Sequence, residues 1–138
     1  MDRIDPPLIA AERESLIAWL DYHRNTLALK CVGLTPEQLC RRPIATTTMS
    51  LMGLVRHMAE VERGWFTRCG GGVSETDAPP IFYDRESNID GDFDDTDPAT
   101  VDADMVTWQE EIARSNEMLA LVDFDDVRHH DRWDQDLD

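Results

Sequence analysis

The residue with the clearest chemical potential is His57, in the run from Ser50 to Phe66. Apolar residues of this run recur at spacings of three and four, which is typical of an amphipathic helix, and Ser50 stands before them as the expected N-cap. The predicted apolar stripe consists of Leu51, Leu54, Met58, Val61 and Trp65. His57 falls on the flank of the stripe, one turn from Glu60. Its imidazole is either a core-edge group bonded to a neighbour, which is the plainer interpretation, or a group with a chemical role.

Gly53 and Gly64 lie on the helical line of His57. Glycine lowers helix propensity, so we expect another part of the chain to approach the helix backbone there. His23 lies beside the apolar stripe of an earlier helix, and the same two interpretations apply to its imidazole.

Several other motifs indicate structure rather than chemistry. The acidic run at residues 90–97 is no EF-hand loop, because Asp95 and Val101 stand where that loop needs glycine and glutamate. We expect this run to be a solvated loop that caps the next helix. Glu110 and Glu111 are interpreted as a solvated helix face, and Cys69 has no histidine near it in sequence.

Composition excludes some classes of partner. The 138 residues carry a net charge of -16, which argues against binding to nucleic acid or to anionic membrane surfaces. The three cysteines are odd in number and widely spaced, which favours free thiols in a reducing compartment. No signal-peptide core or membrane-spanning run is evident, and we expect a cytoplasmic protein with one domain, residues 1–138.

Long helical segments dominate the predicted structure, and no strand is convincing. The expected helices run from residues 8–11 to Cys31 or Val32, over a short turn at residues 36–39, from Leu51 to the glycines at 70–72, and from residues 98–101 to about Leu121. They predict an all-α bundle. A groove between the first and third long helices would be filled by a fourth helix or by a partner chain.

A succession of short motifs resembles the DinB-like superfamily over nearly the whole chain. The motifs are Leu20-Asp21-Tyr22-His23-Arg24, Gly33 to Leu39, Arg42-Pro43, Leu54 to Glu62, Trp65-Phe66 and the single Trp108. The sequence looks closest to an actinobacterial branch related to mycothiol-dependent maleylpyruvate isomerase. The helix that contains His57 is the most specific part of the resemblance.

The resemblance implies an up-down-down-up four-helix bundle that is often a homodimer. It also implies a divalent metal, zinc or nickel, held by a histidine of the second helix and two ligands of the last helix. His57 matches the first of these ligands. In such enzymes the metal binds a low-molecular-weight thiol for transfer or isomerisation of a small-molecule substrate.

The fourth helix and its paired ligands are missing from the sequence, so we expect either a truncated chain or a member that has lost the site. The adjacent His129 and His130 replace those ligands poorly, because neighbouring helix positions point about 100° apart. Two hypotheses follow. One is a metal-dependent, thiol-using transferase or isomerase, with His57 as ligand and with Glu60 and His23 orienting it. The other is a non-catalytic bundle that acts through homodimer or partner association.

Overall fold

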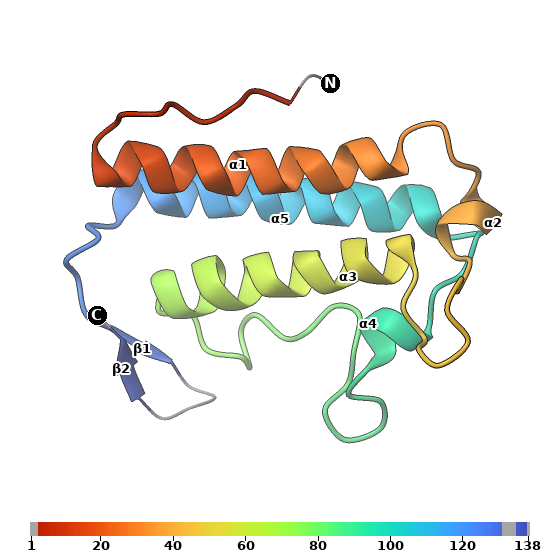
Figure 1. Ribbon diagram of the computed structural model, residues 1–138. Helices are drawn as coiled ribbons and strands as arrows, with labels where there is room; N and C mark the ends of the chain where they lie inside the picture. The colour runs from red at the N-terminus through yellow and green to blue at the C-terminus, as the bar shows by residue number, and fades with distance from the viewer. Residues whose placement is uncertain (1–2, 131–134, 138) are drawn as a thin grey trace. The chain divides into compact units, whose positions relative to one another are not determined.

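The structure is a computed structural model that describes residues 3–130 and 135–137 (Figure 1). The chain forms two compact units, a first that ends at Thr35 and a second that begins at Pro36. No helix among the described residues is both long and apolar enough to cross a membrane.

The first unit contains one long helix, α1 (Glu12–Cys31). Its first turn carries Glu12 and Glu14, and Lys30 lies in its last turn, an arrangement of charges that favours the helix dipole. Gly33 follows with a φ of 77°, the left-handed conformation that commonly terminates a helix. The predicted first helix and its stop are therefore confirmed.

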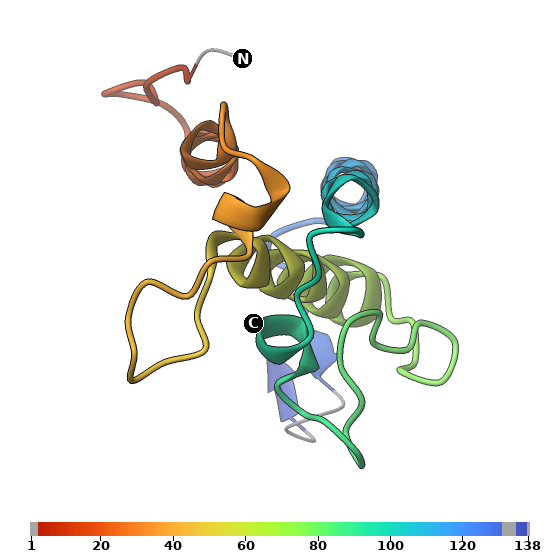
Figure 2. The same ribbon diagram turned by 90° about the vertical axis from the view of Figure 1, so that its right-hand side faces the viewer.

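The second unit is built on two long helices that pack against each other. Its helices are α2 (Pro36–Leu39), α3 (Leu51–Glu62), the π-helix η1 (Arg63–Gly70), α4 (Gly91–Asp94) and α5 (Val101–Leu121). Helix α3 contacts both α5 and the short α4 (Figure 2). The π-helix η1 directly follows α3 and also contacts α5. The all-α class with three long helices is confirmed.

The ends of α3 and η1 follow the sequence signals. The Ser50 hydroxyl accepts a 3.0 Å hydrogen bond from the Gly53 N–H, which confirms the predicted N-cap. Gly72 has a φ of 64° just after η1, so the glycine run ends the helical stretch as predicted. The π-helical geometry of η1, which forms the last eight residues of this helical stretch, was not predicted.

On α3, the buried apolar residues lie one sequence position after the residues of the predicted apolar stripe. Met52, Val55 and Ala59 are fully buried, whereas Leu54, Met58 and Val61 are half-buried and Trp65 is 43% exposed. The prediction of the buried face was wrong because α3 is covered by α4 as well as by α5, so the buried surface is wider than one apolar stripe. On α5 the buried residues include Val101, Trp108, Ser115 and Leu119.

A short hairpin follows α5. Strand β1 (Arg128–His130) pairs antiparallel with β2 (Gln135–Leu137), with Arg128 opposite Leu137 and His129 opposite Asp136. Our expectation of no strands was therefore wrong. Each strand has only three residues and no apolar alternation, so periodicity could not reveal it.

Candidate functional site

His57 on α3 is held by two residues of α4. Its Nδ1 lies 2.8 Å from Oδ2 of Asp92, and its ring stacks on Phe93 with ring centres 4.7 Å apart. The Asp92 side chain is only 6% exposed, whereas that of His57 is 42% exposed. One side of the imidazole is thus fixed by the protein, and the other remains accessible.

Arg56, the neighbour of His57, fixes α4 in place. Its Nε donates to the Asp92 carbonyl at 3.0 Å and a terminal nitrogen donates to the Gly91 carbonyl at 3.1 Å. The other terminal nitrogen bonds the Asp104 carboxylate at 3.1 Å, and the guanidinium lies 4.5 Å from the centre of the Phe82 ring. The buried arginine therefore joins α3, α4 and α5 directly behind the histidine.

The close packing of α4 on α3 depends on a glycine. A Cβ at Gly53 would lie 3.2 Å from a ring carbon of Phe93 and 3.3 Å from its Cα. The expectation that another segment approaches the helix at Gly53 is therefore confirmed. At Gly64 the described residues outside the helix's own backbone bring only a terminal nitrogen of Arg68 within 4 Å, at 3.2 Å, so the expected approach of another segment does not occur there.

Glu60 holds the loop that leads to α4. Its Oε1 accepts 2.6 Å hydrogen bonds from the N–H groups of Ile81 and Phe82. Burial raises the pKa of this carboxyl, although the two N–H groups act in the opposite direction. The prediction that Glu60 orients His57 was wrong, because Asp92 occupies that position and the Glu60 carboxylate turns to the loop backbone.

The acidic run at residues 90–97 is not uniformly solvated, which corrects the sequence interpretation. Asp90, Asp95 and Asp97 are exposed, but Asp92 is buried against His57. The run also provides no side-chain cap to α5, whose N-cap is Thr100. A usable signal was present, since Phe93 is the one apolar side chain in the run and indicates a face that returns to the core.

Glu111 was also misassigned as solvated. Its side chain is 0% exposed, and one oxygen pairs with Arg63 at 3.0 Å and with Arg114. The second oxygen has no hydrogen-bond partner among the described residues. Two arginines compensate the buried charge, so this residue supports the packing of α5 on η1.

His23 belongs to the first unit, where it lies in a small aromatic cluster. Its ring stacks on Trp19, with centres 5.8 Å apart, and meets Tyr22 edge-on at 5.5 Å. This imidazole is exposed. Its expected role beside His57 stays a prediction.

The cysteines do not offer a ready nucleophile. Burial raises the pKa of the thiols of Cys31 and Cys40, which favours their neutral form. Cys69 is buried and free of any disulfide. The chemistry of the site therefore centres on His57.

His57 suits the role of one metal ligand. Because Nδ1 is engaged by a buried carboxylate, Nε2 is the ring nitrogen left for a ligand, which is the arrangement usual for metal-binding histidines. The described residues contain no group of three His, Cys, Asp or Glu side chains able to hold a metal ion. The side chains of His129 and His130 lie outside the described part of the structure.

A family model described as mycothiol-S-transferase matches residues 15–138. No curated protein and no solved structure matched the chain.

Proposed function

We propose that this chain transfers a low-molecular-weight thiol to a small electrophilic substrate, because it belongs to the mycothiol-S-transferase family. Membership of that family also makes the chain DinB-like. The family name points to mycothiol as the thiol. In such a step the S–H proton passes to solvent, the sulfur forms a bond to an electrophilic carbon of the substrate, and the group displaced from that carbon departs with the electron pair of the broken bond.

His57 is the residue to which we assign the centre of this chemistry. The observation that carries the assignment is the contact of its Nδ1 with the buried Asp92, which leaves Nε2 as the other ring nitrogen of a side chain that is 42% exposed. We propose that Nε2 holds a divalent metal, zinc or nickel, together with donors from outside the described residues. Such a metal, when bound, lowers the pKa of a coordinated thiol so that its sulfur is present as thiolate.

The other residues of the site act on His57 and on the segment behind it. Phe93 covers one face of the imidazole and keeps water from it. Arg56 and Glu60 hold the backbone of residues 81–92 by hydrogen bonds to four of its peptide groups. We therefore expect the position of His57 to be fixed before any ligand arrives.

Thiol consumption by the full-length protein tests this function. The assay contains mycothiol, an electrophilic acceptor, and zinc or nickel. We expect metal-dependent transfer that falls by at least about 100-fold in His57→Ala, because the replacement removes a ligand of the metal that would activate the thiol. The control is Asp90→Ala, which removes an exposed carboxylate near the site and leaves the rate unchanged. A His57→Ala variant as active as the wild type would contradict the assignment.

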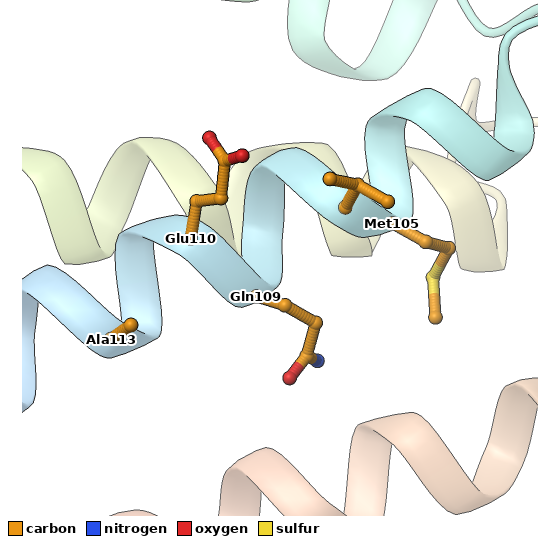
Figure 3. A pocket seen from close by; sticks show the side chains of 5 residues that line it. Met105, Gln109, Glu110 and Ala113 are labelled. Atoms are coloured by element: carbon orange, nitrogen blue, oxygen red, sulfur yellow. The ribbon is translucent and has the colours of Figure 1, made fainter.

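A second candidate function is non-catalytic association of two copies of the chain. The surface that favours it is an apolar depression on α5, lined by Met105, Val106, Gln109, Glu110 and Ala113 (Figure 3). Val106 is 57% exposed there. Sedimentation velocity tests the idea with the wild type and Val106→Asp. We expect a dimer that the aspartate dissociates, and a monomeric wild type would contradict it.

A cytoplasmic location and the absence of nucleic-acid and membrane partners stay predictions from composition. These predictions agree with the small-molecule thiol that the family name gives as a partner. The net charge of -16 supports them through repulsion of anionic surfaces.

A further inference from the structure

The Asp92 carboxylate is fixed on both of its oxygens. Oδ1 accepts a 3.0 Å hydrogen bond from the N–H of Phe93, and Oδ2 lies 2.8 Å from Nδ1 of His57. The carbonyl of the same residue accepts from Arg56. The side chain therefore has little freedom to turn away from the imidazole.

Arg56 holds the backbone of α4 without competing for this carboxylate. Its guanidinium bonds the carbonyls of Gly91 and Asp92, and its charge is paired with Asp104. Among the described residues, His57 is the one side chain that bonds the Asp92 carboxylate. The negative charge of Asp92 is thus directed at a single ring nitrogen.

A carboxylate accepts hydrogen bonds and cannot donate them, so the ring nitrogen beside it must carry the proton. A neutral histidine without such a partner can place its proton on either nitrogen. We propose that Asp92 is a positioning residue that keeps the proton of neutral His57 on Nδ1 and leaves the lone pair of Nε2 on the accessible side. This inference rests on the proposed function, in which Nε2 meets the metal.

Nuclear magnetic resonance of protein labelled with ¹⁵N in histidine reads the tautomer directly. At about pH 9, where an ordinary imidazole is neutral, a two-bond ¹H–¹⁵N correlation distinguishes a protonated ring nitrogen from an unprotonated one. We expect a protonated Nδ1 in the wild type and in Asp90→Ala, the control that removes an exposed carboxylate two residues away. In Asp92→Ala we expect the Nε2–H form to become the major one.

Two spectra would overturn the proposal. One is a wild-type spectrum with the proton on Nε2, and the other is an Asp92→Ala spectrum identical to that of the wild type. Alanine keeps the backbone carbonyl that Arg56 binds, so α4 should stay in place. If Asp92→Ala does not fold, the wild-type spectrum still decides the matter.

Calorimetric titration with nickel separates this inference from the function on which it rests. Loss of a carboxylate behind a ligating histidine weakens metal binding by about 10- to 100-fold, so we expect that loss in Asp92→Ala and none in Asp90→Ala. Equal affinity in all three proteins would overturn the positioning role. A wild type that binds no nickel would contradict the proposed metal, while the tautomer measurement would still test Asp92.

Discussion

His57 and Asp92 are 35 residues apart in the chain, and their side chains meet at 2.8 Å. The contact joins the long helix α3 to the four-residue helix α4 at the end of an irregular loop. Since Arg56 holds the backbone of the same short helix, two consecutive residues of α3 bind one segment. The chemistry of His57 is therefore coupled to the packing of residues 81–94.

Replacing Arg56 by methionine tests the strength of that packing. The change leaves the buried Asp104 carboxylate without its charged partner and removes the guanidinium hydrogen bonds to two carbonyls of α4. We expect the free energy of unfolding, measured with urea, to fall by about 3–5 kcal/mol. Arg41→Met is the control, because Arg41 is exposed, and it should change stability by less than about 0.5 kcal/mol. Equal effects of the two variants would contradict the role of Arg56.

Two glycine replacements should have opposite effects on stability. Alanine at Gly53 meets the Phe93 backbone and ring at 3.2–3.3 Å, so α4 must shift and the protein should be destabilised. Alanine at Gly64 meets a terminal nitrogen of the long Arg68 side chain at 3.2 Å and no backbone of another segment, so it should gain up to about 1 kcal/mol from helix propensity. Urea unfolding of both variants checks the pair. A Gly53→Ala protein more stable than the wild type would show that α4 does not pack closely there.

The raised pKa of Glu60 predicts a specific dependence of stability on pH. A carboxyl whose pKa is higher in the folded than in the unfolded protein binds more protons when folded, so its contribution to stability grows as pH falls from the raised value toward about 4.5. Glu60→Gln keeps an oxygen for the Ile81 and Phe82 N–H groups but does not titrate. We expect the wild type to gain stability relative to Glu60→Gln between pH 7.5 and pH 5 in urea unfolding. A constant difference would show that the carboxyl titrates normally.

The long helices were predictable because local signals specify them. Ser50, Gly33 and Gly72 each act within a few residues of the helix end that they define. These features require no knowledge of the rest of the chain, which is why sequence reasoning reached them.

The partner of His57 was not predictable in the same way. Asp92 lies in an acidic run whose composition is typical of solvated loops, and only the folded chain shows that Arg56 draws this part of the run into the interior. The burial of Glu60 and Glu111 was missed for a related reason. The groups that bond these two carboxylates are the backbone N–H groups of a loop, for Glu60, and an arginine of a neighbouring helix, for Glu111. Hydropathy along the sequence does not predict such contacts.

Calorimetric titration of zinc or nickel into the full-length protein tests most directly whether His57 is a metal ligand in a thiol-transferring protein. We predict stoichiometric binding by the wild type and an affinity at least about 100-fold lower in His57→Ala, because loss of a ligand should weaken metal binding at least as much as loss of a group that hydrogen-bonds to a ligand. Binding by His57→Ala that equals wild-type binding, or no binding by the wild type, would contradict the role of His57 as a ligand.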